Sequence, residues 1–325
     1  MSDTRLKNNL TNREDSSKPR VLEYLRLCRI GNVFTAFADV FMGYTVVSGT
    51  LAFEAPLVLL LIASGSLYTA GMVFNDWFDV EQDRQERPSR PIPSGAITRS
   101  SAARLGVSLL ILGISAAGMA SFLSESGSWT PIGVAALLTI LILAYNAGLK
   151  KTWLGPVAMG GCRAGNALLG MSFVVGGWHG WSVHHFTIAA AMGVFVAGIT
   201  TMAKGEAKPE HRFGVLGGLI LMIAGLGILA SVYRQFPANV PLALAPEELW
   251  GLLLLLIAFP VFRRGLGAVI QPTPKSVQQA VVSSILTLVV LDASIALLLG
   301  GTMPAMVTLA MLGPAFLISH WISPT

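Results

Sequence analysis

Long apolar segments separated by short polar loops recur along the chain from residue 31 to the end. Each segment approaches the roughly 20 helical residues that are needed to cross a hydrocarbon core of about 30 Å. The strands of a membrane barrel would be about half as long and would alternate polar with apolar residues. The predicted helical spans cover approximately residues 31–50, 56–75, 102–122, 131–147, 155–176, 185–203, 213–232, 247–262, 279–300 and 303–321. The pattern therefore predicts an all-α integral membrane protein.

The distribution of Lys and Arg predicts how these spans are oriented. Of the 22 basic residues, 20 fall in the N-terminal segment or in alternate loops, Arg234 falls in the opposite set of loops, and Arg163 lies within a span. Because cytoplasmic loops are enriched in Lys and Arg, we expect the N-terminus and the charged loops to face the cytoplasm. The net charge of +5 is thereby explained by membrane topology, and a nucleic-acid partner is not expected.

Composition agrees with this assignment and divides the chain into two parts. Hydrophobic residues make up 53% of the chain and charged residues only 12%, about half the share of an average soluble domain. Residues 1–20 are polar and are expected to form a disordered cytoplasmic tail, whereas residues 21–325 form the membrane domain. Residues 21–30 mix apolar and charged positions, as an interfacial helix does, and we expect this helix to run into the first span.

The sequence NDWFDVEQD, residues 75–83, ends the second span and concentrates carboxylates there. On a continuous helix, Asp76, Asp79 and Asp83 would lie within about 60° of one face. Three close carboxylates repel one another unless a cation neutralises them, and Mg²⁺ prefers oxygen ligands together with substrate phosphates. Asn75 adds an amide oxygen, and the arginines that follow could bind phosphate or pair with the acids. The alternative is a solvated loop whose charges pair only with one another.

NDxxDxxxD followed by RPxRPIPSG resembles the first aspartate-rich motif of the UbiA superfamily of membrane prenyltransferases. This resemblance implies a bundle of nine transmembrane helices, here with a tenth at the C-terminus, around a cavity that binds a prenyl diphosphate through Mg²⁺. It implies that Asp76, Asp79 and Asp83 bind metal and act in catalysis, and that Asn75, Arg87 and Arg90 contact the diphosphate. A tenth helix and the CRxxN element also resemble a bacterial branch called EboC, which would place the chain in a bacterial inner membrane.

The second acidic motif of this family, usually DxxxD, corresponds here to GEAKPEHRFG. Glu206 and Glu210 keep the spacing of the two aspartates, and the resemblance implies that they hold a second metal ion. Pro209 between them would remove a helical hydrogen bond and distort the segment. An exposed polar loop without metal is the alternative.

Further polar residues lie between the two motifs. Tyr145 and Lys150, in YNAGLKK, match the family's tyrosine and lysine element, and the lysine would contact the diphosphate, although it could also serve only to orient the span. Arg163 and Asn166 lie within a span, where unpaired charge is costly, and both are candidate diphosphate ligands. Arg163 could instead pair with an acid. Lys204 is a further candidate diphosphate ligand. For the intramembrane acids Asp39 and Asp292 we expect snorkelling or hydrogen bonds between helices.

Taken together, these residues predict a Mg²⁺-dependent prenyltransferase that moves an isoprenyl group from a prenyl diphosphate to an aromatic or lipophilic acceptor among the membrane lipids. The metal would neutralise charge on the departing diphosphate, and a dry cavity would shelter the allylic cation. The alternative is a protein of the same fold that binds or transports an isoprenoid diphosphate without transferring it. A secondary transporter is a third possibility, but transporter sites lie near the midplane rather than at the membrane surface.

Overall fold

A computed structural model describes residues 20–124, 128–204, 212–237, 240 and 242–322, with the side chains described up to Ile318. The described chain is helical, as the hydropathy pattern predicts. Its helices are α2 (Arg20–Leu27), α3 (Val33–Ser48), α4 (Ala55–Phe78), α5 (Val80–Glu86), α6 (Arg99–Phe122), α7 (Thr130–Ala147), α8 (Gly155–Met171), α9 (Val183–Lys204), α10 (Arg212–Ala230), α11 (Glu247–Ile270), α12 (Pro274–Gly300), α13 (Thr302–Ala310) and α14 (Leu312–Ile322), with short 3-10 turns that include η2 (Ile30–Asn32) and η3 (Leu149–Lys151).

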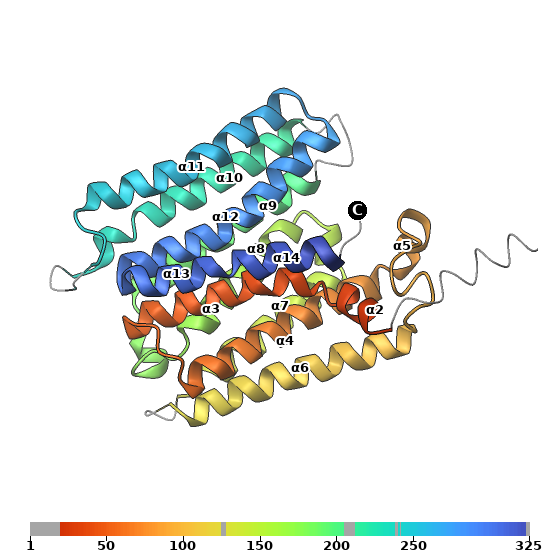
Figure 1. Cartoon of the computed structure of the whole chain (residues 1–325), viewed down its shortest axis with the longest axis horizontal. Helices are drawn as coiled ribbons and strands as arrows, with labels where there is room; N and C mark the ends of the chain where they lie inside the picture. The colour runs from red at the N-terminus through yellow and green to blue at the C-terminus, as the bar shows by residue number, and fades with distance from the viewer. Residues whose placement is uncertain (1–19, 125–127, 205–211, 238–239, 241, 323–325) are drawn as a thin grey trace, which may run out of the picture.

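The long helices run side by side and form a closed bundle (Figure 1). Contacts lead from α3 through α4, α6, α7, α8, α9, α10 and α11 to α12, and α12 packs back against α3. Eight of the described helices are long and apolar enough to cross a membrane, and the 17-residue α8 is not among them. The short helices α2 and α5 lie together at one end of the bundle (Figure 1). We call this the charged end, because it carries the aspartate-rich segment.

Local sequence explains where several helices begin. Proline occupies the first turn of α4, α7, α8 and α12, where no backbone N–H is needed for a helical bond. The side-chain oxygens of Thr98 and Thr273 accept the backbone N–H of Ser101 and Ser276, which caps α6 and α12. These caps fix the helix ends that border the polar loops.

Two predicted continuities are wrong. The interfacial helix does not run into the first span, because the chain turns at Arg29, whose φ of 45° is left-handed and ends the helical path before η2. The tenth segment is two helices rather than one. Pro314 lacks the N–H that would bind the carbonyl of Ala310, so α13 ends there and α14 begins at Leu312. Both halves pack against α3, and α14 also contacts η2.

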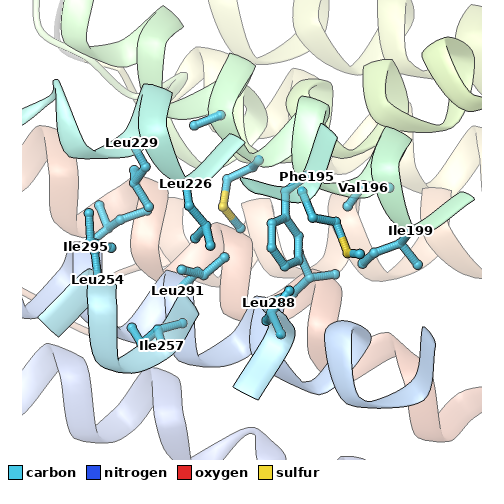
Figure 2. Close-up of a cluster of buried hydrophobic side chains, with 14 of the residues drawn as sticks. Phe195, Val196, Ile199, Leu226, Leu229, Leu254, Ile257, Leu288, Leu291 and Ile295 are labelled. Atoms are coloured by element: carbon cyan, nitrogen blue, oxygen red, sulfur yellow. The ribbon is translucent and has the colours of Figure 1, made fainter. Parts of the chain in front are cut away.

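The apolar core is largest between α9, α10, α11 and α12. Figure 2 shows Phe195 of α9, Leu226 of α10, Ile257 of α11 and Leu291 of α12 meeting there. A second cluster joins α3, α4, α6, α7 and α8. The cavity described below lies between these two clusters.

Glycine allows α3 and α8 to approach each other closely. A Cβ atom at Gly170 would lie 2.8 Å from the Cα of Val40 and 2.9 Å from the carbonyl oxygen of Asp39. A Cβ at Gly43 would lie 2.8 Å from backbone atoms of α8. Because these neighbours are backbone atoms rather than flexible side chains, a larger residue would force the helices apart.

We expect Gly170→Ala to lower the free energy of unfolding by about 1–3 kcal/mol, the usual cost of overpacking. Gly217→Ala, on α10, is the matched control, because a Cβ at Gly217 would meet no atom within 4 Å. Unfolding in mixed detergent micelles measures both variants. Equal stability of Gly170→Ala and the wild type would contradict the close contact between α3 and α8.

Candidate active site

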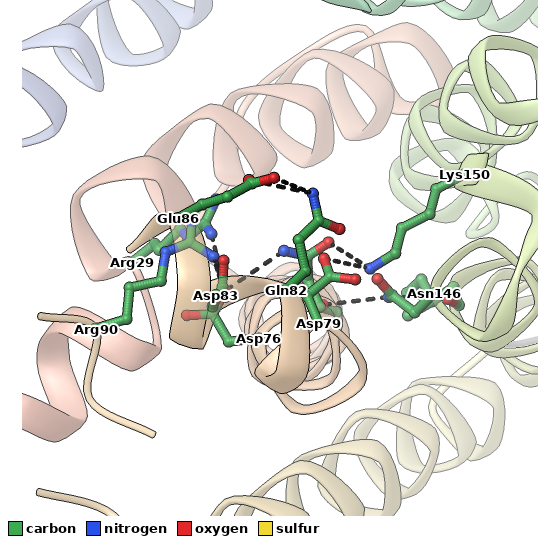
Figure 3. A network of polar contacts seen from close by, with 12 residues as sticks. Arg29, Asp76, Asp79, Gln82, Asp83, Glu86, Arg90, Asn146 and Lys150 are labelled. Carbon is green, nitrogen blue, oxygen red and sulfur yellow. Dashed lines mark hydrogen bonds and ion pairs between the residues drawn. The ribbon is translucent and has the colours of Figure 1, made fainter. Parts of the chain in front are cut away.

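The aspartate-rich segment is not one continuous helix. α4 ends at Phe78, Asp79 leaves helical geometry with φ −90° and ψ 5°, and α5 begins at Val80. The prediction that the three aspartates share one face of a single helix is therefore wrong. The break turns the Asp79 carboxylate to one side of the segment, while Asp76 and Asp83 face the other side (Figure 3).

Asp76 and Asp83 share one guanidinium. Arg90 Nη1 donates to Asp83 Oδ2 at 2.6 Å and to Asp76 Oδ1 at 3.2 Å. Arg29 Nη2 donates to the same Asp76 oxygen at 2.9 Å. Asp76 is 3% exposed and Asp83 only 2%, so these are not the charges of a solvated loop. Such buried carboxylates must be paired, and Arg29 and Arg90 supply the countercharge.

Asp79 is held from the opposite side by Lys150. The ammonium Nζ donates to Asp79 Oδ2 at 2.7 Å and to the amide oxygen of Asn75 at 3.1 Å. Lys150 belongs to η3, the turn that follows α7, so this ion pair joins two segments that are 71 positions apart. Beside it, Asn146 Nδ2 donates to the carbonyl oxygen of Gly71 at 3.2 Å and fastens α7 to α4. Figure 3 shows Asn146 and Lys150 together on this side of Asp79.

A cavity of about 370 Å³ opens into the bundle from this polar end. Arg29, Asn32, Asn75, Tyr145 and Asn146 line it near the charged end. Further in, the wall is mostly apolar, with side chains such as Met72, Leu138, Ile142, Ile199 and Leu288, and it includes Tyr68. This volume lies within the range of small-molecule sites in proteins. The arrangement provides a charged mouth for an anion and an apolar interior for a hydrocarbon chain.

Other predicted site residues lie elsewhere. Arg87 is exposed at the C-terminal end of α5. Lys204 is exposed at the end of α9, and its Nζ donates to the carbonyl oxygen of Thr152 at 2.7 Å, so it does not line the cavity. Glu206 and Glu210 lie outside the described residues, as does Pro209. Arg163 and Asn166 do line the cavity, and Arg163 pairs with the two intramembrane acids Asp39 and Asp292.

The oxygen donors at the charged end suit Mg²⁺. Asp79 Oδ1 is buried and has no hydrogen-bond partner, and the carboxylates of Asp76 and Asp83 and the Asn75 amide add further hard oxygen atoms. Within the part of the chain that the structure describes, no three His, Cys, Asp or Glu side chains are grouped closely enough to hold an ion by themselves. Mg²⁺ usually keeps water and takes phosphate oxygens alongside one or two carboxylates, so the donor set fits a metal that arrives with a diphosphate.

Sequence reasoning did not assign a role to Arg29 or Asn146. Arg29 precedes the first span, and its left-handed backbone and its contact with Asp76 follow from the turn at η2. Strained backbone of this kind is common at functional sites. Asn146 stands beside Tyr145 at the end of an otherwise apolar span, and this isolated polar position was the available signal.

We expect Arg90→Ala to lower the free energy of unfolding by about 3 kcal/mol, because it leaves the carboxylate of Asp83 buried without its cation. The matched control is Arg84→Ala, whose pair with Glu81 is 60% and 71% exposed and should contribute no more than about 0.5 kcal/mol. Denaturation in mixed micelles compares the two. Equal losses in both variants would contradict the assigned burial of Asp83.

The fold and this mouth define a helical membrane protein with a carboxylate-rich entrance to an internal cavity. The profile of the UbiA prenyltransferase family matches residues 33–266, so the chain belongs to this family. This match confirms the resemblance drawn from the first motif.

Relatives and solved structures are consistent with this assignment. The digeranylgeranylglyceryl phosphate synthases of Sulfurisphaera tokodaii and Methanoregula boonei are both 36% identical to the chain, over 49% and 48% of it and over 55% and 52% of their own lengths. The chain thus spans about half the length of these curated relatives. A solved structure described as digeranylgeranylglyceryl phosphate synthase has a TM-score of 0.63 at 18% identity and covers 87% of this chain and 99% of its own.

A UbiA homolog from Archaeoglobus fulgidus, solved with GPP and Mg²⁺, has a TM-score of 0.57 at 13% identity, with 84% of this chain and 99% of that chain covered. At such identities the likeness shows the fold alone, and the fold is the predicted UbiA-type bundle. The resemblance to the EboC branch, the bacterial host membrane and the cytoplasmic orientation stay predictions.

Proposed function

We propose that this protein is a Mg²⁺-dependent prenyltransferase that moves an isoprenyl group from a prenyl diphosphate to a hydroxyl-bearing lipophilic acceptor inside the membrane. The observation that carries the proposal is the polar end of the cavity, where the lining residues Arg29 and Asn75 contact the buried Asp76 and Lys150 next to an apolar interior. A prenyl diphosphate matches this arrangement, because its diphosphate suits the charged end and its hydrocarbon chain suits the apolar interior. The charged end would face the cytoplasm, where soluble diphosphates are found.

The donor would bind with its diphosphate at the charged end. Bound Mg²⁺ would be held by Asp76, Asp79 and Asp83, with Glu206 and Glu210 as further candidate ligands, and it would stabilise the negative charge of the leaving group. Lys150 and Asn75 are positioned to contact phosphate oxygens, since the Lys150 ammonium already spans Asp79 and Asn75. Arg29 and Arg90 orient the carboxylates of Asp76 and Asp83 through their ion pairs.

The prenyl chain would lie in the apolar part of the cavity. Tyr68 and Tyr145 line this space, and their ring faces can stabilise a developing allylic cation. The surrounding apolar side chains exclude water, which would otherwise capture the cation. Membrane lipid would surround the outward-facing side chains of the bundle, of which Phe259 and Leu255 are well exposed.

The acceptor class follows from the relatives. Their name, digeranylgeranylglyceryl phosphate synthase, indicates a product in which glycerol oxygens carry prenyl groups. Of the aromatic and lipophilic acceptors that the sequence leaves open, this supports a lipophilic alcohol of the glyceryl type. A prenylated glyceryl phosphate and a hydroxybenzoate therefore serve as the two acceptor probes.

Purified protein in lipid nanodiscs, supplied with radiolabelled geranylgeranyl diphosphate, Mg²⁺ and either probe, tests the proposal. We expect released pyrophosphate and a labelled lipid in the glyceryl arm. If the diphosphate binds but neither probe yields a labelled product, the enzymatic function is wrong and the protein is a non-catalytic isoprenoid-diphosphate binder or transporter. Product in the aromatic arm alone would overturn the proposed acceptor class.

We expect Asp79→Ala to abolish Mg²⁺-dependent binding of geranylgeranyl diphosphate, because it removes a carboxylate that contacts Lys150 and has one oxygen without a partner. Glu81→Ala is the matched control, since Glu81 is exposed and pairs only with neighbouring Arg84 among the described contacts. Equilibrium binding with and without Mg²⁺ distinguishes them. Unchanged binding in Asp79→Ala would exclude this aspartate from the diphosphate site.

The contribution of the second motif has its own test. The double variant Glu206→Gln with Glu210→Gln should weaken Mg²⁺-dependent diphosphate binding if these side chains hold a second ion, because amides are poorer ligands for Mg²⁺ than carboxylates. Equilibrium binding of geranylgeranyl diphosphate, measured at increasing Mg²⁺ concentration, tests this expectation. A wild-type Mg²⁺ dependence in the double variant would show that the second motif holds no metal.

A further inference from the structure

A second charged cluster lies inside the bundle, away from the aspartate-rich mouth. Asp39 of α3 and Asp292 of α12 are both 0% exposed. Arg163 of α8 lies between them, with its Nη2 2.7 Å from Asp39 Oδ1 and 3.0 Å from Asp292 Oδ2. The cluster thus joins three helices through one guanidinium. This confirms helix-to-helix pairing as the reason for the two intramembrane acids.

The cluster holds more acid than base. Two ionised carboxylates and one guanidinium would leave a surplus negative charge in a membrane interior, which is costly. One proton on the pair of carboxyl groups removes the surplus, and the two groups are coupled because both contact Nη2 of Arg163. The resting cluster is then neutral, with one ionised carboxylate.

The contacts of the two carboxyl groups indicate that Asp39 is the ionised one. Its Oδ2 accepts a hydrogen bond from Asn166 Nδ2 at 2.7 Å, and Asn166 is itself held by Ser64, whose hydroxyl donates to Asn166 Oδ1 at 2.7 Å. Asp39 is also closer to Arg163 than Asp292 is. More donors favour the charged form, so the shared proton belongs with Asp292.

Asp39 and Arg163 line the cavity, whereas Asp292 does not. Three buried atoms of this cluster have no hydrogen-bond partner: Asp39 Oδ1, Asp292 Oδ1 and Arg163 Nε. The Oδ1 of Asp39 touches the guanidinium only as an ion pair, outside hydrogen-bond geometry. An acceptor atom of this kind in a cavity wall suits a ligand that donates an O–H.

The cluster lies on the inner side of the cavity. Asp39 follows Asn32 by seven residues, which is about 10 Å along a helix. Asn32 and Asn75 border the cavity at the charged end, where the diphosphate would bind. A nucleophile that displaces a diphosphate approaches the carbon from the side away from the leaving group. In this cavity, the side away from the diphosphate is the inner side, where the cluster lies.

We propose that Asp39 accepts the proton of the attacking hydroxyl, with Arg163 and Asn166 as positioning residues. The inference rests on the proposed function. In the step, the acceptor oxygen forms a bond to C1 of the prenyl group, the bond between C1 and the diphosphate oxygen breaks, and the diphosphate leaves with the bonding electron pair. The hydroxyl proton passes to the Asp39 carboxylate, so charge and atoms balance.

The surroundings of Asp39 define which groups can affect its titration. α8 contributes Arg163, α12 contributes Asp292, and α4 contributes the uncharged hydroxyls of Ser64 and Tyr68. α13 and the described side chains of α14, which also pack against α3, carry no charged group. A base that must be ionised predicts loss of kcat on the acidic side of its pH profile.

Asp39→Asn in nanodiscs, assayed with geranylgeranyl diphosphate and a prenylated glyceryl phosphate, tests this. We expect kcat to fall about 100-fold, the usual contribution of a general base, and the acidic limb of the kcat profile to disappear. Equilibrium binding of geranylgeranyl diphosphate should stay at the wild-type level, because Asp39 is remote from Asp79 and Lys150 in the bundle. Asp292→Asn is the matched control, since it changes the other carboxyl group that contacts Arg163 but does not line the cavity, and it should keep the acidic limb.

The outcomes separate this inference from the proposed function. If wild-type protein transfers the prenyl group and Asp39→Asn keeps both its rate and its acidic limb, Asp39 is not the proton acceptor. If the two Asn variants lose the same fraction of kcat and both keep the limb, the role of Asp39 is only structural. If the wild type yields no product, the proposed function fails first. If Asp39→Asn does not fold, Asp39→Glu is tested in its place. We expect Asp39→Glu to have a lower kcat and to keep the acidic limb of the pH profile. A wild-type kcat in Asp39→Glu would overturn the proposal.

Discussion

The charged end of this protein is organised by the need to neutralise carboxylates that are almost fully buried. Asp76 and Asp83 would be untenable as isolated ions at 3% and 2% exposure. Their countercharges come from Arg29 before the first span and from Arg90 in the loop after α5, while Lys150 serves Asp79 from beyond α7. The ion pairs therefore tie the ends of several helices together around the cavity mouth.

This arrangement also explains how the mouth could change on binding. Each aspartate is engaged by a side chain that could equally contact a phosphate, because Lys and Arg bind carboxylate and phosphate oxygens alike. A metal-bound diphosphate can enter by exchanging one set of ionic partners for another. Asp79 Oδ1 is buried and has no hydrogen-bond partner, so it can accept a new contact without losing an existing hydrogen bond.

Inside the bundle, close packing of α3 on α8 at Gly43 and Gly170 brings Asp39 next to Arg163 and Asn166. Closure of the ring by α12 against α3 then adds Asp292. The same contacts that complete the bundle thus build a polar cluster in the wall of an otherwise apolar cavity. Its presence fits an acceptor with a polar group better than a cavity for hydrocarbon alone.

The sequence was sufficient for eight of the ten predicted spans, because length and hydropathy decide whether a segment can cross a membrane. It also singled out the segment that is proposed as the site, since charge at the end of an apolar span is conspicuous. The turn at Asp79 was not predictable from spacing, and neither were the ion pairs of Asp79 with Lys150 and of Asp83 with Arg90, because the fold alone brings these partners near. Likewise Asp39, Arg163 and Asp292 were each conspicuous, but their pairing required the ring to close. The break before α14 had a readable signal in Pro314.

The central claim is that the aspartate-rich mouth binds a prenyl diphosphate with its chain directed into the cavity. A structure of the protein with Mg²⁺ and a non-hydrolysable analogue of geranylgeranyl diphosphate tests it most directly. The account predicts diphosphate density between Asp79, Lys150 and Asn75, with the chain running past Tyr68 and Tyr145. Density for the analogue elsewhere, with the Lys150 to Asp79 ion pair unchanged, would contradict it.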